Sequence, residues 1–161
     1  MLQELTSGQQ TYFWPMANPY DAEYFMRRAL QEAQIAAERG EVPVGAVVVS
    51  RERIIGRAHN LTETLNDVTA HAEMQAITAA ADYLGGKYLR GCSLYVTLEP
   101  CAMCAGALYW SQVQRVIYAA EDPKRGYRQM GGQLHPKTEV HQGPLAGEAQ
   151  AILQEFFKNR R

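Results

Sequence analysis

The spacing of apolar and polar positions predicts four helices and four strands. Helical spacing of apolar residues, or an alanine-rich composition followed by a stop signal, predicts helices at residues 21–40, 70–84, 101–111 and 147–158. Short runs of β-branched and other apolar residues, typical of buried strands, predict strands at residues 46–50, 53–58, 93–97 and 113–119. The polar segment 60–69 and the charged, glycine-bearing segment 121–132 are expected to be loops.

Local signals support these boundaries and indicate an α/β protein. Asp21 can cap the first helix, and Gly40 is a stop signal at its end. Residues 51–52 leave room only for a short turn, so the first two strands form a hairpin and imply an antiparallel edge. The later strands are separated by helices, which imply parallel crossovers. We therefore expect one mixed sheet with helices on both faces.

Composition narrows the class of protein. With 161 residues, of which 47% are apolar and 20% charged, the chain is typical of a globular domain. We expect a single domain over residues 20–161. Residues 1–19 lack the basic and apolar regions of a secretion signal, and we interpret them as a disordered leader. No apolar stretch approaches the roughly 20 residues of a membrane span, so no membrane partner is expected.

Charge and cysteine content restrict the function further. Three cysteines are too few for a disulfide framework, and the Cys-x-x-Cys pair among them indicates metal or redox chemistry in a reducing cytoplasm. The net charge is −1, so any contact with nucleic acid must come from local basic patches.

Three residues have the spacing of a catalytic metal site. His71 lies at the first turn of one expected helix, and Cys101 and Cys104 lie at the first turn of another. Residues three apart share a helix face, so both sulfurs can bind one ion. A mixed nitrogen–sulfur set favours Zn²⁺ over Mg²⁺ or Ca²⁺. Three protein ligands leave the fourth tetrahedral position for water.

Glu73 is the candidate catalytic residue. Zinc lowers the pKa of its bound water from about 15.7 to near 7, and a neighbouring carboxylate can carry the proton to a substrate. The alternative, a redox-active cysteine pair, gives Glu73 no role. His-x-Glu followed by Pro-Cys-x-x-Cys is the signature of zinc-dependent nucleobase deaminases. The pattern therefore predicts a hydrolytic enzyme with one Zn²⁺ per subunit.

From residue 21 onward the chain resembles the cytidine-deaminase-like superfamily, and within it the bacterial tRNA adenosine deaminases. The resemblance rests on residues 40–46 (Gly-Glu-Val-Pro-Val-Gly-Ala), 58–60 (Ala-His-Asn), 69–73 (Thr-Ala-His-Ala-Glu) and 94–106, which contain Leu-Glu-Pro-Cys-Ala-Met-Cys. It implies a three-layer α/β/α sandwich with a mixed central sheet. It also implies a homodimer that converts the wobble adenosine of a tRNA anticodon to inosine.

The resemblance assigns further residues to the substrate. Asn60 is expected to hydrogen-bond the purine edge, with Val42, Pro43 and Ala72 lining the base pocket. The alternative for Asn60 is a loop residue that caps its own turn. An anticodon loop suits this chemistry, because its bases are already unpaired and are extruded at lower cost than from a duplex.

Basic residues supply candidate contacts to RNA phosphates, with a solvated loop and tail as the alternative interpretation. The candidates are Lys124, Arg125 and Arg128 in one expected loop, with Lys158, Arg160 and Arg161 at the C-terminal end.

Two other functions compete with this one. The chain lacks an Asn-His pair that the tRNA enzymes carry after the loop at 121–132, and residues 109–110 and 118–121 resemble bacterial guanine deaminases. A deaminase of free nucleobases or nucleosides, of guanine or cytosine type, is therefore the alternative. A non-catalytic partner subunit is disfavoured, because such relatives usually lose the carboxylate that Glu73 supplies.

Several other side chains are expected to be structural. Cys92 would block the water position if it bound zinc, so it is interpreted as a structural thiol. His59 is assigned to the loop structure, and His135 and His141 to the surface. Tyr109 and Trp110 are expected in the core or at a homodimer interface.

Overall fold

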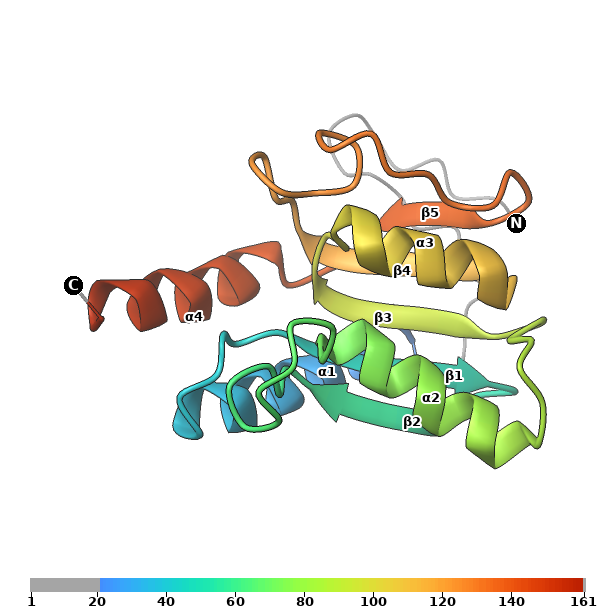
Figure 1. The fold of residues 1–161 in the computed structure, drawn as a ribbon, viewed down its shortest axis with the longest axis horizontal. Coiled ribbons are helices and arrows are strands. Elements are labelled where there is room, and N and C mark those ends of the chain that lie inside the picture. The colour runs from blue at the N-terminus through green and yellow to red at the C-terminus, as the bar shows by residue number, and fades with distance from the viewer. Residues whose placement is uncertain (1–20, 161) are drawn as a thin grey trace, which may run out of the picture.

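A computed structural model describes residues 21–160, which form a mixed sheet of five strands flanked by helices (Figure 1). The predicted leader, residues 1–19, and Arg161 lie outside the described residues. The helices are α1 (Ala22–Glu38), α2 (Ala72–Leu84), α3 (Ala102–Ser111) and α4 (Ala146–Lys158). The strands are β1 (Gly45–Ser50), β2 (Arg53–His59), β3 (Ser93–Leu98), β4 (Arg115–Ala120) and β5 (Glu139–Gln142).

The strand order is β2-β1-β3-β4-β5. Strand β1 is antiparallel to both β2 and β3, whereas the pairs β3–β4 and β4–β5 are parallel. The predicted hairpin is present: Arg51 and Glu52 both adopt positive φ angles, 49° and 63°, as a two-residue turn between twisted strands requires. The predicted fold class, a three-layer α/β/α sandwich with a mixed sheet, is confirmed.

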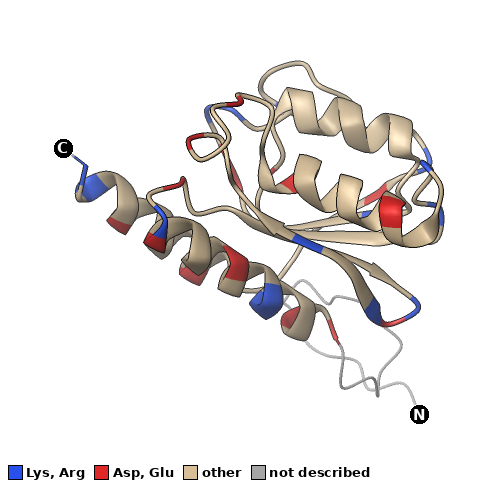
Figure 2. Cartoon of the chain, turned by 60° about the horizontal axis from the view of Figure 1, so that its bottom comes forward, with Lys and Arg blue, Asp and Glu red and all other residues tan. Residues whose placement is uncertain are grey.

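Alternation along the strands divides the core into two layers. Val47, Tyr95 and Ile117 belong to the core layer beneath α1 and α4, and their neighbours Val48 and Val96 belong to the core layer beneath α2 and α3. Figure 2 shows helices on both faces of the sheet. A Cβ at Gly45 would lie 2.0 Å from the carbonyl oxygen of Ala29, so only glycine lets α1 pack so closely on β1.

The two helical layers differ in charge. In Figure 2 most of the charged residues of the helices lie on α1 and α4. By sequence, α3 carries no charged residue and α2 carries only Glu73 and Asp82. The layer of α2 and α3, which carries few charges, is the one whose helix N-termini hold the candidate metal ligands.

Strand β5 was not predicted. Its sequence, Glu-Val-His-Gln, is polar and only four residues long, so it carries no apolar pattern. Polar residues suit this position because β5 is an edge strand with both faces partly exposed. Helix α4 forms where a helix was predicted, but few of its side chains are buried. Ala149 is its one buried residue, and the helix extends away from the sheet with Phe157 50% exposed (Figure 1). Among the described residues, no helix combines the length and the apolar character needed to cross a membrane.

Candidate active site

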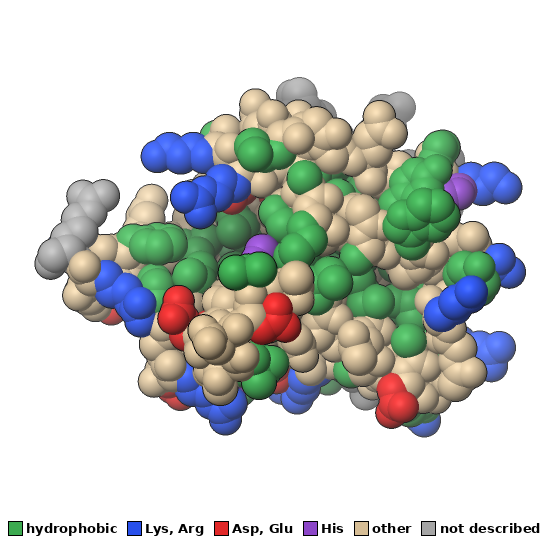
Figure 3. Space-filling view, in the orientation of Figure 1, with side chains coloured by type: hydrophobic (Ala, Val, Ile, Leu, Met, Phe, Trp, Pro, Cys, Tyr) green, Lys and Arg blue, Asp and Glu red, His purple; other side chains and the backbone are tan. Residues whose placement is uncertain are grey.

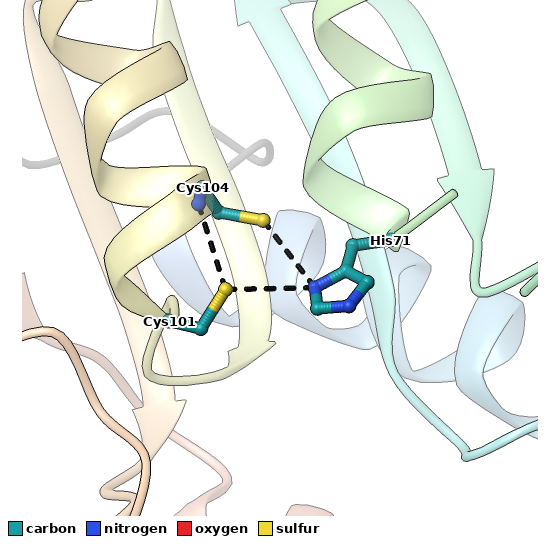
Figure 4. A group of neighbouring side chains, drawn as sticks. All are labelled: His71, Cys101 and Cys104. Carbon is teal, nitrogen blue, oxygen red and sulfur yellow. Dashed lines mark hydrogen bonds between the residues drawn. The ribbon is translucent and has the colours of Figure 1, made fainter. Parts of the chain in front are cut away.

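The three predicted metal ligands converge on one point (Figure 4). His71 Nδ1 lies 3.6 Å from Cys101 Sγ and 3.5 Å from Cys104 Sγ, and the three ligand atoms all lie within 4.8 Å of one another. Zn–S bonds of about 2.3 Å and Zn–N bonds of about 2.1 Å place tetrahedral ligand atoms about 3.6 Å apart. The geometry therefore fits a zinc ion with three protein ligands.

Two helix N-termini position these ligands. His71 is the N-cap residue of α2, and Cys101 is the N-cap residue of α3; both have the extended backbone typical of that position. The backbone N–H of Cys104 donates to Cys101 Sγ at 3.5 Å. Free N–H groups and the positive end of the helix dipole stabilise thiolates, which are the form that binds metal.

The two cysteines shift each other's pKa in opposite directions. The thiol of Cys104 donates to Cys101, and together with the nearby His71 imidazole it lowers the pKa of Cys101 to about 4. The pKa of Cys104 is raised, first by the same hydrogen bond and then by burial. A divalent cation would replace that proton, so metal binding should release it.

Glu73 lies beside the ligand set without belonging to it. Its side chain is on the first turn of α2 and is 4% exposed. Burial raises the pKa of Glu73 to about 7, against the opposing effect of the His71 charge. A carboxyl group with a pKa near neutrality can both accept and donate a proton, which is the property that general acid–base catalysis needs.

Asn60 follows β2 and is brought to the metal end by two backbone hydrogen bonds. Its N–H donates to the Val44 carbonyl at 3.1 Å, and the next residue, Leu61, donates to the carbonyl of Ala70, just before His71. The Asn60 side chain is 7% exposed, yet its carboxamide forms no hydrogen bond with any described residue. Turn capping, the alternative for Asn60, therefore does not occur among these residues.

The remaining residues predicted for the base pocket belong to the same end of the sheet. Pro43 and Ala72 are buried, and Val42 is partly buried against the core layer of α2 and α3.

Comparisons with known proteins agree with this geometry. Residues 19–120, which include all three ligands, match the family model described as the cytidine and deoxycytidylate deaminase zinc-binding region. The chain belongs to this deaminase family. The match to the family model supports the predicted zinc cofactor, since the matched region is the family's zinc-binding region and contains the three ligands.

Similar proteins extend the match beyond that region. The tRNA-specific adenosine deaminases of Aquifex aeolicus and Agrobacterium fabrum are 50% and 45% identical over 86% of this chain and 95% of theirs. A solved structure from a study of A-to-I editing by tRNA:A34 deaminases has a TM-score of 0.77 and 45% identity, covering 81% of this chain and 99% of that one. Guanine deaminase from Bacillus subtilis has a TM-score of 0.61 and 40% identity, covering 69% and 68%.

Glu41 holds the loop that follows Asn60, a role that the sequence did not reveal. Its carboxylate is fully buried and accepts hydrogen bonds from the backbone N–H groups of Glu63 and Thr64 and from the hydroxyls of Thr62 and Thr64. Burial opposes ionisation, but these donors together lower the pKa of Glu41. The ionised carboxylate thereby fixes the start of the loop that carries Asn60.

Glu99 is a second buried carboxylate that orders the deaminase site. It precedes Pro100 and Cys101, and its side chain is 2% exposed and accepts from Arg128 Nη2 at 2.9 Å. Gly126 lies so close that a Cβ there would be 2.1 Å from a Glu99 oxygen, and it forms a β-bridge with Cys101. Glu99 therefore connects the cysteine loop to the loop after β4.

This contact changes the interpretation of one predicted RNA contact. Arg128 is bound to Glu99 and also lies 3.5 Å from Glu121, so it is engaged within the protein. The side chains of Lys124 and Arg125 are exposed and form no ion pair with a described residue. Of the C-terminal candidates, Arg160 donates to the Gly40 carbonyl.

The other side chains singled out by sequence fall outside the ligand set. Cys92 is buried at the start of β3, and His59 Nδ1 lies 2.9 Å from a Glu32 carboxylate oxygen. Tyr109 is partly buried against the His135 ring, at 5.2 Å between ring centroids. Trp110 is 77% exposed, so it lies outside the core, and its predicted place at a homodimer interface stays a prediction.

Proposed function

We propose that this deaminase converts adenosine to inosine at the wobble position of tRNA by hydrolysis. One observation carries the chemistry: three ligand atoms at tetrahedral spacing, with a buried carboxylate beside them that is not a fourth ligand. The substrate class is supported by 45–50% identity to tRNA-specific adenosine deaminases over 86% of the chain.

His71, Cys101 and Cys104 would hold the zinc ion. When bound, zinc lowers the pKa of a coordinated water to near 7 and so supplies the nucleophile at neutral pH. Glu73 would accept the proton of that water on its carboxylate and deliver it to N1 of the adenine ring. A second proton carried by Glu73 would go to the departing amino group, so that adenosine and water give inosine and ammonia.

Asn60 would orient the base. Its carboxamide offers one acceptor and two donor hydrogens, none of them used by a described residue. Such a group, buried at the end of β2, can hydrogen-bond the edge of a purine without first breaking a contact within the protein. Val42, Pro43 and Ala72 would exclude water from the base.

A four-substrate assay tests this function. The zinc-loaded protein is incubated with an anticodon stem-loop containing a wobble adenosine, and separately with adenosine, guanine and cytosine, while ammonia release is measured. We expect the stem-loop to be turned over far faster than the small molecules. Faster turnover of free guanine would instead establish the second candidate, a nucleobase deaminase, which the 40% identity to a guanine deaminase favours.

Glu73→Gln separates catalysis from metal binding in the same assay. The amide keeps the size of the side chain but cannot carry the proton, so kcat should fall by about 10²–10⁴-fold. Zinc content should remain at one ion per chain, because Glu73 is not in the ligand set. Full activity in this variant would remove Glu73 from the mechanism.

We also propose a homodimer that forms through α3, the helix without charged residues. Helix α3 carries no charge and exposes Trp110 and Met103, at 77% and 37%, which suits contact with a second copy. Trp110→Glu should shift the sedimentation of the protein from dimer to monomer.

A cytoplasmic location is proposed because thiolate ligands need a reducing compartment.

A further inference from the structure

A basic hollow lies at the end of the sheet opposite the metal site. It has a volume of about 830 Å³ and receives three arginines from two segments: Arg51 and Arg53 from the β1–β2 hairpin, and Arg90 from the loop before β3. Ile55 and the last residues of α2, Tyr83 and Leu84, supply its apolar wall. Figure 3 shows lysine and arginine side chains along this right-hand edge of the molecule.

Among residues 21–160, no acidic side chain pairs with Arg51, Arg53 or Arg90 of this hollow. Arg51 and Arg53 form no ion pair or hydrogen bond with any described residue, although the exposed Glu52 stands between them. None of the described lining residues is acidic, and Asp82 flanks the hollow on α2. Since the whole chain has a net charge of −1, these unpaired arginines are a local concentration of charge.

Arg90 is held in place for a ligand. Its Nε donates to Gln112 Oε1 at 2.8 Å, and its guanidinium lies 4.7 Å from the centroid of the Tyr88 ring. The two terminal nitrogens of the guanidinium form no hydrogen bond with a described residue, so they can form paired hydrogen bonds with phosphate oxygens. Tyr88 and Tyr83 are 42% and 57% exposed, so aromatic rings stand beside the cations.

We propose that this hollow binds the phosphate backbone of the RNA substrate, in the helical stem beyond the loop that enters the active site. The proposal rests on the proposed function, since it presumes an RNA hairpin at the zinc site. Arginines without partners bind phosphate without displacing a protein carboxylate, whereas Arg128 would first have to leave Glu99.

The distance between the two sites suits such a stem. Helix α2 begins beside His71 and ends at Leu84 in the wall of the hollow, and twelve helical steps of about 1.5 Å give about 18 Å. Strand β1 spans the same gap with about 17 Å of extended chain. A short stretch of RNA helix can cover this length. RNA helices are bound through such backbone contacts rather than by base sequence.

The double variant R51Q/R53Q tests the proposal on the anticodon stem-loop. We expect KM to rise about tenfold with kcat unchanged, and the slope of log Kd against log salt to become shallower by about two, one per lost phosphate contact. Arg90→Gln, on a separate segment, should change both measurements in the same direction. Zinc content and the thermal midpoint of the double variant should match those of the wild type.

The matched control is R27Q/R28Q, which removes the same charge from α1 on the other face of the sheet. It should leave KM and the salt slope as they are in the wild type. Equal effects in the two double variants, or no effect in R51Q/R53Q, would overturn the proposal. A change of oligomeric state in R51Q/R53Q would assign the hollow to a protein interface instead. Failure of the wild type to deaminate the stem-loop would count against the proposed function, which is a separate outcome.

Discussion

The charged side chains near the two ends of α2 differ in burial and in hydrogen bonding. At its N-terminus, Glu73 is buried, and the nearby carboxylates of Glu41 and Glu99 are buried among hydrogen-bond donors. At its C-terminus, the arginines of the hollow are exposed and largely unpaired. A buried charge requires a fixed set of partners, because an unsatisfied one is costly. An exposed cation keeps its hydration and remains available to a ligand.

This difference suits two separate functions in one molecule, the chemical step at one end and the binding of RNA at the other. The buried end holds a few atoms at fixed distances, which the chemical step demands. The exposed end offers charge that acts over several ångströms and needs little precision, as the binding of a flexible polyanion requires. Variants at the buried end should therefore lose turnover, and variants at the exposed end should lose affinity for RNA.

Loss of the metal should have the largest effect, and only at the buried end. Removal of zinc by a chelator, or Cys104→Ser, should abolish ammonia release from the stem-loop, because the three-ligand set is then incomplete. RNA binding by the metal-free protein, measured by filter retention, should persist with its salt dependence intact. Loss of both properties together would show that the two ends are not independent.

Gly126→Ala should destabilise the cysteine loop. The added methyl would meet the Glu99 carboxylate and the Asp122 carbonyl oxygen at 2.1 and 2.6 Å, so the free energy of unfolding should fall by about 1–3 kcal/mol. Zinc affinity, measured by competition with a chromogenic chelator, should fall as well, since Gly126 pairs with Cys101. The matched control is Gly106→Ala, where nothing lies within 4 Å of the added methyl and zinc affinity should not change.

Glu41→Gln should produce a smaller, pH-dependent effect. The pKa of Glu41 is lowered in the folded protein, so its contribution to stability is present above the unfolded pKa of about 4.5 and is lost as pH falls through the folded value. At pH 7 the variant should lose about 1–2 kcal/mol in urea unfolding, because an amide cannot accept from four donors. The gap between variant and wild type should narrow toward pH 3. A gap independent of pH would mean that Glu41 is not ionised in the folded protein.

The smallest effect on stability is expected at the exposed end. R51Q/R53Q should change the free energy of unfolding by no more than about 0.5 kcal/mol, as is usual for surface substitutions that break no contact. Urea unfolding measures this directly. A loss of several kcal/mol would mean that these arginines serve the fold rather than a ligand.

The sequence by itself determined the reaction centre and most of the fold. His71, Cys101 and Cys104 are recognisable because each metal ligand lies at a helix N-terminus, and helix starts depend on residues a few positions away. Short runs of apolar, often β-branched residues in β1 and β3 predicted buried strands for the same local reason. The polar edge strand β5 was not predicted, because it forms by pairing with β4 and its own residues show no apolar pattern.

Only the tertiary structure decided which charges are neutralised. Arg128 and Glu99 are 29 residues apart in sequence, and Glu41 meets the loop at residues 62–64 more than 20 residues away. The arginines of the hollow likewise come from segments joined by α2. Neutralisation of a charge depends on which distant segments the sheet brings together, and side-chain type alone does not carry that information.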